Sequence, residues 1–158
     1  MRSVARPQRL DEDERLLWKA YRDVYQRLSE VLQDQLLHDA GLSESEYGVL
    51  VVLSYAPGGV MRAREVCSEL AWDRSRLSHL VGRMEKRGLV VREECSEDGR
   101  GTMVRLTDAG REAVEDAAPE HSEAVRRYFF NLLSKSERET LATVFDRVLE
   151  NITRAKEA

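Results

Sequence analysis

The sequence predicts a mainly α-helical fold that contains one small β-hairpin and has long helices near both ends. Two observations predict it. Apolar residues recur at helical spacing over most of the chain, whereas between residues 89 and 106 two short strand-like runs flank a polar turn. With 158 residues, of which 42% are hydrophobic, the chain is long enough for one domain with its own core.

A long first helix is expected over residues 12–40, and Gly41 is a suitable C-cap for it. Its length exceeds that of most globular helices, which favours a dimerisation arm or a bridge between two lobes. Residues 1–11 lack periodicity and are expected to form a flexible segment. The apolar positions of the helix are Leu16, Leu17, Ala20, Tyr21, Val24, Tyr25, Leu28, Val31, Leu32 and Leu36.

Three shorter helices and the hairpin are expected within residues 41–106. Ser43 and Glu46 have the spacing of a capping box, and the apolar run 47–56 behind them predicts a buried helix. Residues 62–71 predict a short amphipathic helix with Val66 and Leu70 turned inward. Asp73 can cap a third helix over 74–87, after which strands are expected from Leu89 and over Thr102–Leu106. The third helix has a core stripe formed by Leu77, Leu80, Val81 and Met84.

Residues 107–158 predict two further helices. The first begins at Thr107 and runs to about Leu133, with an interruption or kink near Pro119. Ser134 and Glu137 form a second capping box before a last helix with a clear apolar stripe. Because a small middle domain leaves these stripes little to pack on, residues 12–40 and 107–158 are expected to form the dimerisation region of a homodimer. The alternative is a monomer that covers itself with its own termini.

The order of helix, turn, helix and hairpin describes a winged helix-turn-helix, which places its second helix in the major groove of DNA. The charge distribution agrees with this interpretation. Residues 73–92 carry six basic and two acidic side chains, a net charge of +4, whereas the whole chain carries −4, which leaves −8 for the remainder. A local positive face on an acidic body suits the phosphate backbone of double-stranded DNA. On charge alone, the alternative is a solvated helix face.

The segment LSHLVGRMEKRGLVVREECSEDGRGTMVRLTDAGREA, residues 77–113, resembles the recognition-helix and wing signature of MarR-type transcriptional regulators. The resemblance extends over about residues 12–152 and is most specific in 73–112. It implies a winged helix-turn-helix domain, residues 41–106, flanked by dimerisation helices. The matching features are the run Glu85-Lys86-Arg87-Gly88-Leu89, then Asp98 and Arg100 in the wing, then Leu106-Thr107-Asp108-Ala109-Gly110. Many members have Asp-Arg-Arg in the wing, whereas Gly99 replaces the first arginine here.

The candidate DNA contacts are polar side chains outside the core stripe of the predicted recognition helix. Arginine can bond guanine bidentately, and serine and histidine can reach base edges or phosphates. Cations at a helix N-terminus oppose the helix dipole, so helix stability does not explain two arginines there. Asp98 is expected to pair with a nearby arginine and fix the wing. The candidates are Arg62, Arg64, Arg74, Ser75, Arg76, Ser78, His79 and Arg83, with Arg100 as a minor-groove probe.

A homodimer would place its two recognition helices about 34 Å apart and read a pseudo-palindrome with half-sites about ten base pairs apart. The resemblance implies a regulator, most simply a repressor, that a small and often aromatic ligand releases from DNA. Such a ligand would lie between the dimerisation helices and the winged domain. Packing in the core is the alternative role for each aromatic candidate. The candidate ligand residues are Trp18, Tyr21, Tyr25, His38 and Tyr47.

A thiol-based oxidant sensor that uses Cys67 or Cys95 is the alternative form of control. Acidic neighbours of Cys95 disfavour its thiolate, and Cys67 is expected to be buried. The cysteines lack the spacing of metal ligands, and the three histidines lie far apart in the sequence, so no bound metal is expected. The chain contains no catalytic or nucleotide-binding motif, so we expect neither enzymatic activity nor a cofactor. No apolar run approaches the roughly 18 residues of a membrane span and the start is no secretory signal, which favours a cytoplasmic protein without a membrane partner.

Overall fold

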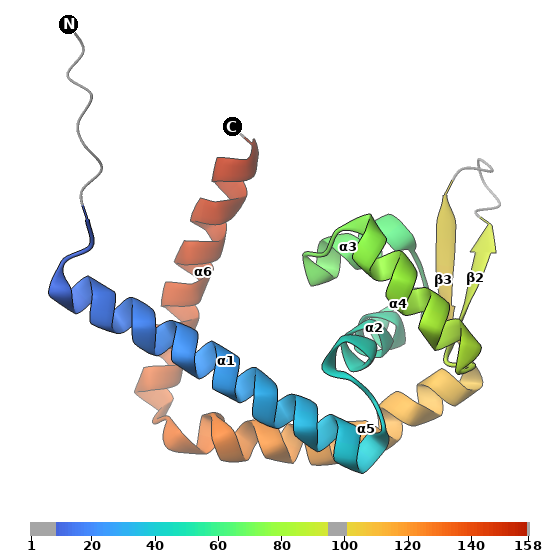
Figure 1. The fold of residues 1–158 in the computed structure, drawn as a ribbon, viewed down its shortest axis with the longest axis horizontal. Helices are drawn as coiled ribbons and strands as arrows, with labels where there is room; N and C mark the ends of the chain where they lie inside the picture. Colours follow the sequence, from blue (N-terminus) through green and yellow to red (C-terminus); the bar gives the residue numbers. More distant parts are fainter. Residues whose placement is uncertain (1–8, 95–100, 158) are drawn as a thin grey trace, which may run out of the picture.

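The computed structural model describes residues 9–94 and 101–157 as a compact domain connected to a helical arm (Figure 1). In chain order the elements are α1 (Glu12–Ala40), α2 (Glu44–Tyr55), η1 (Pro57–Gly59), β1 (Val60–Arg62), α3 (Ala63–Leu70), α4 (Arg74–Lys86), β2 (Val90–Glu94), β3 (Thr102–Leu106), α5 (Asp108–Tyr128), η2 (Phe130–Leu132) and α6 (Lys135–Glu157). The domain holds α2, α3, α4 and the sheet. The arm holds α6 and the start of α1, and α5 runs along the base between the two parts (Figure 1).

The sheet has three antiparallel strands in the order β1-β3-β2, so β3 is central. Val90 pairs with Leu106 in the hairpin, and Val60 pairs with Arg105 on the other side of β3. The hairpin strands were predicted from the sequence, but β1 was not. Three residues are too few to show the alternation of a strand, and β1 exists only because β3 offers it a free edge.

The core lies where α2, α3 and α4 meet the sheet and the first half of α5. All four residues of the predicted α4 stripe are buried, with at most 3% of each exposed, which confirms the helical register. Val66 is fully buried, as expected for the short amphipathic helix, whereas Leu70 is only partly buried and packs at the edge of the core. Val49, Leu50 and Leu53 bury the inner face of α2.

The helices begin at the N-cap residues that the sequence predicts, where local hydrogen bonds cap them. Ser43 Oγ accepts from the Glu46 backbone at 3.0 Å, and Glu46 Oε2 accepts from the Ser43 backbone at 2.9 Å. Asp73 Oδ1 accepts from the backbone N–H of Arg76 at 2.8 Å and begins α4. Ser134 and Glu137 form the second predicted capping box before α6. Each of these motifs satisfies backbone donors that the first helical turn leaves without a partner.

The helix α5 differs from its prediction in two ways. It continues through Pro119 as one helix, without the expected interruption, and it ends at Tyr128 rather than near Leu133. Pro119 removes one intrahelical donor and its ring crowds the preceding turn, so the kink that the sequence also allowed stays a prediction. The backbone of Phe129 leaves the helical region, with φ −134° and ψ −69°, and η2 follows.

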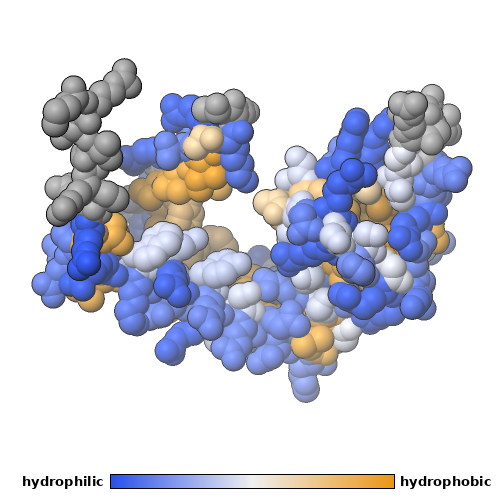
Figure 2. Space-filling model, turned by 45° about the horizontal axis from the view of Figure 1, so that its top comes forward, coloured by the Kyte–Doolittle hydropathy of each residue, from blue (hydrophilic) through white to orange (hydrophobic). Residues whose placement is uncertain are grey.

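The arm, which holds α6 and the start of α1, exposes apolar side chains that the single chain does not cover. The second half of α1 packs on α5 and buries Leu32 and Leu36. No residue is buried in the first half of α1 or over residues 135–156 of α6. Figure 2 shows hydrophobic side chains gathered on the arm beside the open gap that faces the domain. The exposed apolar residues of the two helices include Leu16, Leu17, Trp18, Val24, Val144, Phe145, Val148, Leu149 and Ile152.

A close backbone approach at Gly110 fixes the start of α5 against the end of the α4–β2 connection. A Cβ at Gly110 would lie 2.0 Å from the carbonyl oxygen of Leu89, an oxygen that also accepts from the Thr107 backbone at 3.2 Å. We therefore expect Gly110→Ala to lower the free energy of unfolding by about 1–3 kcal/mol or more, as overpacking does. Urea denaturation followed by circular dichroism measures the change.

Gly82→Ala is the matched control, since Gly82 is also a helical glycine but has room for a methyl group. The nearest atom to its added Cβ would be Arg92 Nη2 at 3.7 Å, an ordinary contact. Alanine should stabilise α4 at this position by about 0.5–1 kcal/mol. Equal effects of the two substitutions would show that the approach at Leu89 does not constrain the fold.

Candidate nucleic-acid interface and ligand cavity

The helix α4 has two distinct faces. Its apolar stripe is buried in the core, and the Asp73 cap sets where the first turn begins. The polar side chains predicted as DNA contacts all lie on the exposed face. They are Arg74, Ser75, Arg76, Ser78, His79 and Arg83.

A hollow of about 1000 Å³ lies between α3, α4 and the sheet. It brings together five of the predicted contacts: Arg62, Arg64, Arg74, Ser75 and Ser78. Arg92 and Thr102 of the hairpin complete its wall, and the sequence analysis gave neither of them a role. The strand position of Arg92, on the exposed side of β2, is the signal that could have identified it. The hollow thus carries several guanidinium groups on one concave surface.

Arg76 is not part of this hollow. Its guanidinium carbon lies 4.1 Å from the centre of the Trp72 ring, and Nη2 donates to Ser45 Oγ at 3.4 Å. Stacking on an indole face is favourable for arginine and restricts the directions in which its donors point. Arg76, one of the predicted DNA contacts, is therefore held by two neighbours, Trp72 and Ser45.

Two ion pairs fix the hairpin relative to α4 and to the turn before β1. Arg92 donates to the Glu85 carboxylate from both its backbone and its Nε, each at 2.8 Å. Chiefly through the backbone hydrogen bond, Arg92 lowers the pKa of Glu85. Arg105 donates to Glu93 at 2.6 and 3.1 Å and to the carbonyl oxygen of Gly58 at 3.4 Å. These contacts set the direction of the wing strands.

The remaining predicted contacts on α4 are separate from the hollow. His79 and Arg83 are exposed on α4 but do not line the hollow. Asp98 and Arg100, the wing residues of the prediction, lie outside the residues that the structure describes, as do Gly99 and Cys95.

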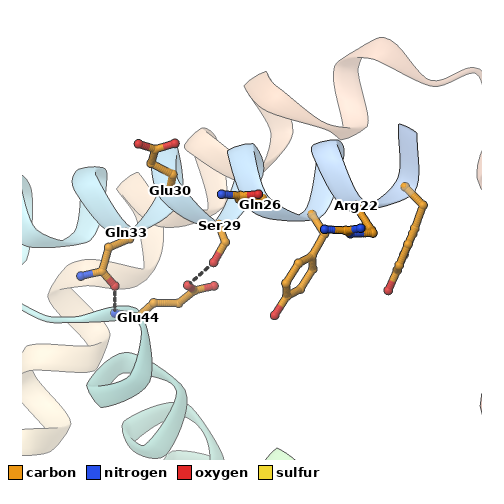
Figure 3. A pocket seen from close by; sticks show the side chains of 8 residues that line it. Arg22, Gln26, Ser29, Glu30, Gln33 and Glu44 are labelled. Atoms are coloured by element: carbon orange, nitrogen blue, oxygen red, sulfur yellow. Dashed lines mark hydrogen bonds between the residues drawn. The ribbon is translucent and has the colours of Figure 1, made fainter. Parts of the chain in front are cut away.

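A second hollow, of about 510 Å³, lies along α1 where this helix passes the start of α2 (Figure 3). In Figure 3 the carboxylate of Glu44 projects from α2 toward Ser29, whose hydroxyl donates to it at 2.6 Å. Gln33 Oε1 accepts from the backbone N–H of Glu44 at 2.8 Å. The wall consists of Tyr21, Arg22, Tyr25, Gln26, Ser29, Glu30, Gln33 and Glu44, so it combines two aromatic residues with six polar or charged ones.

The five predicted ligand residues are not gathered in one place. Tyr21 and Tyr25 line the cavity, and Trp18 stacks on Tyr21 with ring centres 5.3 Å apart. The side chain of His38 is 89% exposed and lies 4.0 Å from Asp39. Tyr47 is half-buried against His121 of α5, with ring centres 4.7 Å apart. The polar wall residues were missed, although Arg22, Gln26, Ser29 and Gln33 recur at helical spacing and could have been recognised as one stripe.

Other chemistry is sparse in the described part of the chain. Cys67 is buried, as predicted, and its thiol lies 3.8 Å from the carbonyl oxygen of Asp73. Within residues 9–94 and 101–157, histidine, cysteine and carboxylate side chains form no group of three that could hold a metal ion. None of the helices in these ranges combines the length and the apolar character that crossing a membrane requires.

Comparison with known proteins places this geometry in context. The sequence model of the MarR family matches residues 40–101. The structure is similar to that of Sco3205, a MarR family transcriptional regulator from Streptomyces coelicolor in complex with DNA, with a TM-score of 0.89, 37% identity and coverage of 93% of this chain and 92% of that one. It is also similar to AbsC, a MarR family regulator of the same organism, with a TM-score of 0.88, 33% identity and coverage of 93% and 99%.

A third relative is the uncharacterised helix-turn-helix regulator YdgJ of Bacillus subtilis. It is 30% identical over 112 residues, which represent 71% of this chain. The match spans 66% of YdgJ, just under two thirds of its length.

The burial of His121 on α5 predicts a pH dependence of stability near neutrality. Burial lowers the pKa of His121 below 6.5, and the nearby Glu44 only partly opposes this. The folded chain therefore binds this proton less readily than the unfolded chain. The contribution of neutral His121 to the free energy of unfolding should be fully present above pH 6.5 and should be lost as the pH decreases below it. The urea midpoint of the wild type should be lower at pH 5.5 than at pH 7.5. For His121→Gln the difference between the two midpoints should be smaller. An equal decrease in both proteins would contradict this assignment.

Proposed function

The chain belongs to the MarR family of transcriptional regulators, and we propose that it binds specific double-stranded DNA as a homodimer and acts as a repressor. The family consists of regulators rather than enzymes. Residues 41–106 would form the DNA-binding domain, and residues 12–40 and 107–158 the dimerisation region. We place its action in the cytoplasm, where a DNA-binding regulator meets its operator.

The observation that carries this proposal is the basic concave surface between α3, α4 and the hairpin. Arg64 and Arg74 are exposed there beside Ser75 and Ser78, on the N-terminal parts of two consecutive helices. In a helix-turn-helix, the N-terminal residues of the recognition helix contact the base edges. Cations on the preceding helix can reach the phosphates beside the groove. Arg76, His79 and Arg83 extend the same exposed face, and Arg100 would probe the minor groove from the wing.

The exposed apolar face of the arms supports a homodimer. Phe145 of α6 is 46% exposed and Leu149 is 61% exposed in the single chain, and α1 exposes Leu16 and Leu17 as well. A large exposed apolar patch marks an interaction surface, and a two-fold partner would cover it with the same patch. Such a dimer would read two half-sites about ten base pairs apart. Binding across a promoter would then block transcription.

The cavity beside α1 supports release by a small aromatic molecule. Tyr21 and Tyr25 offer ring faces, and Arg22, Gln26 and Glu44 offer polar groups that can orient a ligand. Ligand sites typically combine aromatic walls with a few fixed polar groups. A thiol-based alternative gains no support at Cys67, which is buried.

DNA selection from a random duplex pool tests the function. We expect the wild type to enrich a pseudo-palindrome and to lose affinity steeply as salt increases, because phosphate contacts release counterions. Arg74→Ala should weaken binding and should reduce the slope of log affinity against log salt by about one. Arg76→Ala should cost about 1–3 kcal/mol and relax base preference. Fluorescence anisotropy with labelled duplexes gives both quantities.

Arg126→Ala is the control for charge, since Arg126 lies on α5 away from α4 and pairs with Glu123. It should leave affinity and salt slope unchanged. If the wild type enriches no sequence, or binds every duplex with an affinity that salt does not change, the proposed function is wrong.

A charge on the α6 stripe tests the homodimer. Phe145→Lys would place an ammonium in the interface and should convert the dimer into monomers in sedimentation equilibrium. Glu150→Lys introduces the same group on the opposite, charged side of α6 and should leave the dimer intact. A wild type that sediments as a monomer would contradict the proposal.

A further inference from the structure

The family motif at the end of α4 contains an arginine that DNA contact does not explain. Arg87 is the C-cap of α4, at the end opposite to Arg74. Its guanidinium donates from Nη1 to Glu46 Oε1 at 2.7 Å and from Nη2 to the carbonyl oxygen of Gly41 at 2.9 Å. One side chain thus connects the recognition helix to the start of α2 and to the C-cap of α1.

The acceptor of this contact is an unusual side chain. Glu46 is a buried carboxylate, with 7% of the residue exposed. Burial raises its pKa, but hydrogen bonds from the Ser43 backbone and from Arg87 outweigh burial, so the net shift lowers the pKa. The carboxylate is therefore ionised at neutral pH. Its position depends on two partners that come from different parts of the chain.

The neighbouring residue of the same turn holds the other end of α4. Ser45 Oγ accepts from Arg76 Nη2, and Arg76 lies two residues after the first residue of the helix. Ser45 and Glu46 are consecutive, yet they contact α4 near its beginning and at its C-cap. The first turn of α2 therefore lies along α4 as a two-point support.

We propose that Arg87 and Glu46 form a positioning pair that orients the recognition helix for base readout, an inference that rests on the proposed DNA binding. The pair acts through α4 and does not touch the nucleic acid. Nη1 and Nη2 of Arg87 both donate to acceptors within the protein. Arg87 also lies at the C-terminal end of α4, which is the end farther from the major groove in this class of fold. The competing role is a phosphate contact, because the Arg87 side chain is 43% exposed.

A double-mutant cycle on the full chain separates the two roles. The proteins are the wild type, Arg87→Met, Glu46→Gln and the double variant, each with the duplex that the wild type selects and with a scrambled duplex. Each single substitution should weaken specific binding by about tenfold, and the double variant should be no weaker than the singles, as expected for residues that act through one contact. Binding to the scrambled duplex should change little, so the specificity ratio falls.

The salt dependence gives a readout that a phosphate contact would not reproduce, and the fall in the specificity ratio separates positioning from a general loss of structure. The slope of log affinity against log salt should stay at the wild-type value in all variants, because no phosphate contact is lost. Arg87→Lys should fall between the wild type and Arg87→Met, since lysine can replace one of the two hydrogen bonds. Circular dichroism at the assay temperature confirms that each protein is folded.

Three results would overturn the inference while leaving the proposed function intact. The first is a wild-type affinity in both single variants. The second is a loss confined to Arg87→Met with a slope smaller by about one, which identifies a phosphate contact. The third is full additivity in the double variant. If Arg87→Met does not fold, Arg87→Lys and Glu46→Gln carry the same comparison, and a wild type that binds no duplex overturns both proposals.

Discussion

The buried carboxylate of Glu46 is the constraint on which the placement of the recognition helix depends. It accepts the Ser43 backbone N–H and so begins α2, and it accepts Arg87 Nη1 and so holds the end of α4. A buried charge is costly unless its partners are well placed. Because the two oxygen atoms of one carboxylate satisfy a helix start and a distant guanidinium, a rotation of this side chain alters both contacts. The angle between α2 and α4 is therefore tightly specified.

A second constraint acts directly after α4, at the base of the hairpin. Gly110 lets the first turn of α5 approach the Leu89 carbonyl, and Thr107 both caps α5 and donates its hydroxyl to the carbonyl of Gly88 at 2.6 Å. The α4–β2 connection is thereby joined to α5, which leads into the arm. The recognition helix is thus fixed at its C-cap by α2 and just beyond it by α5.

The parts that could be predicted from the sequence are those in which cause and effect lie a few residues apart. Ser43, Asp73 and Ser134 cap helices three residues away, and the α4 stripe follows from periodicity alone. The pair of Arg87 and Glu46 is 41 residues apart, and that of Arg105 and Gly58 is 47 apart. Such contacts follow from packing, as does β1, whose edge exists only once β3 is formed. Packing also explains why Tyr47 and His38, which were predicted as ligand residues, do not line the hollow beside α1.

The charge count of residues 73–92 illustrates how this limit affects function. The segment has a net charge of +4, but the charge of Arg87 is balanced by Glu46, which lies outside the segment, and Arg92 is engaged by Glu85 within it. Arg76 is stacked on Trp72. The cations of the segment that remain least constrained are thus a small subset, and Arg64 of α3 joins Arg74 on the concave surface. The field that a phosphate backbone meets is assembled from two helices, and its shape depends on which arginines the fold has already engaged.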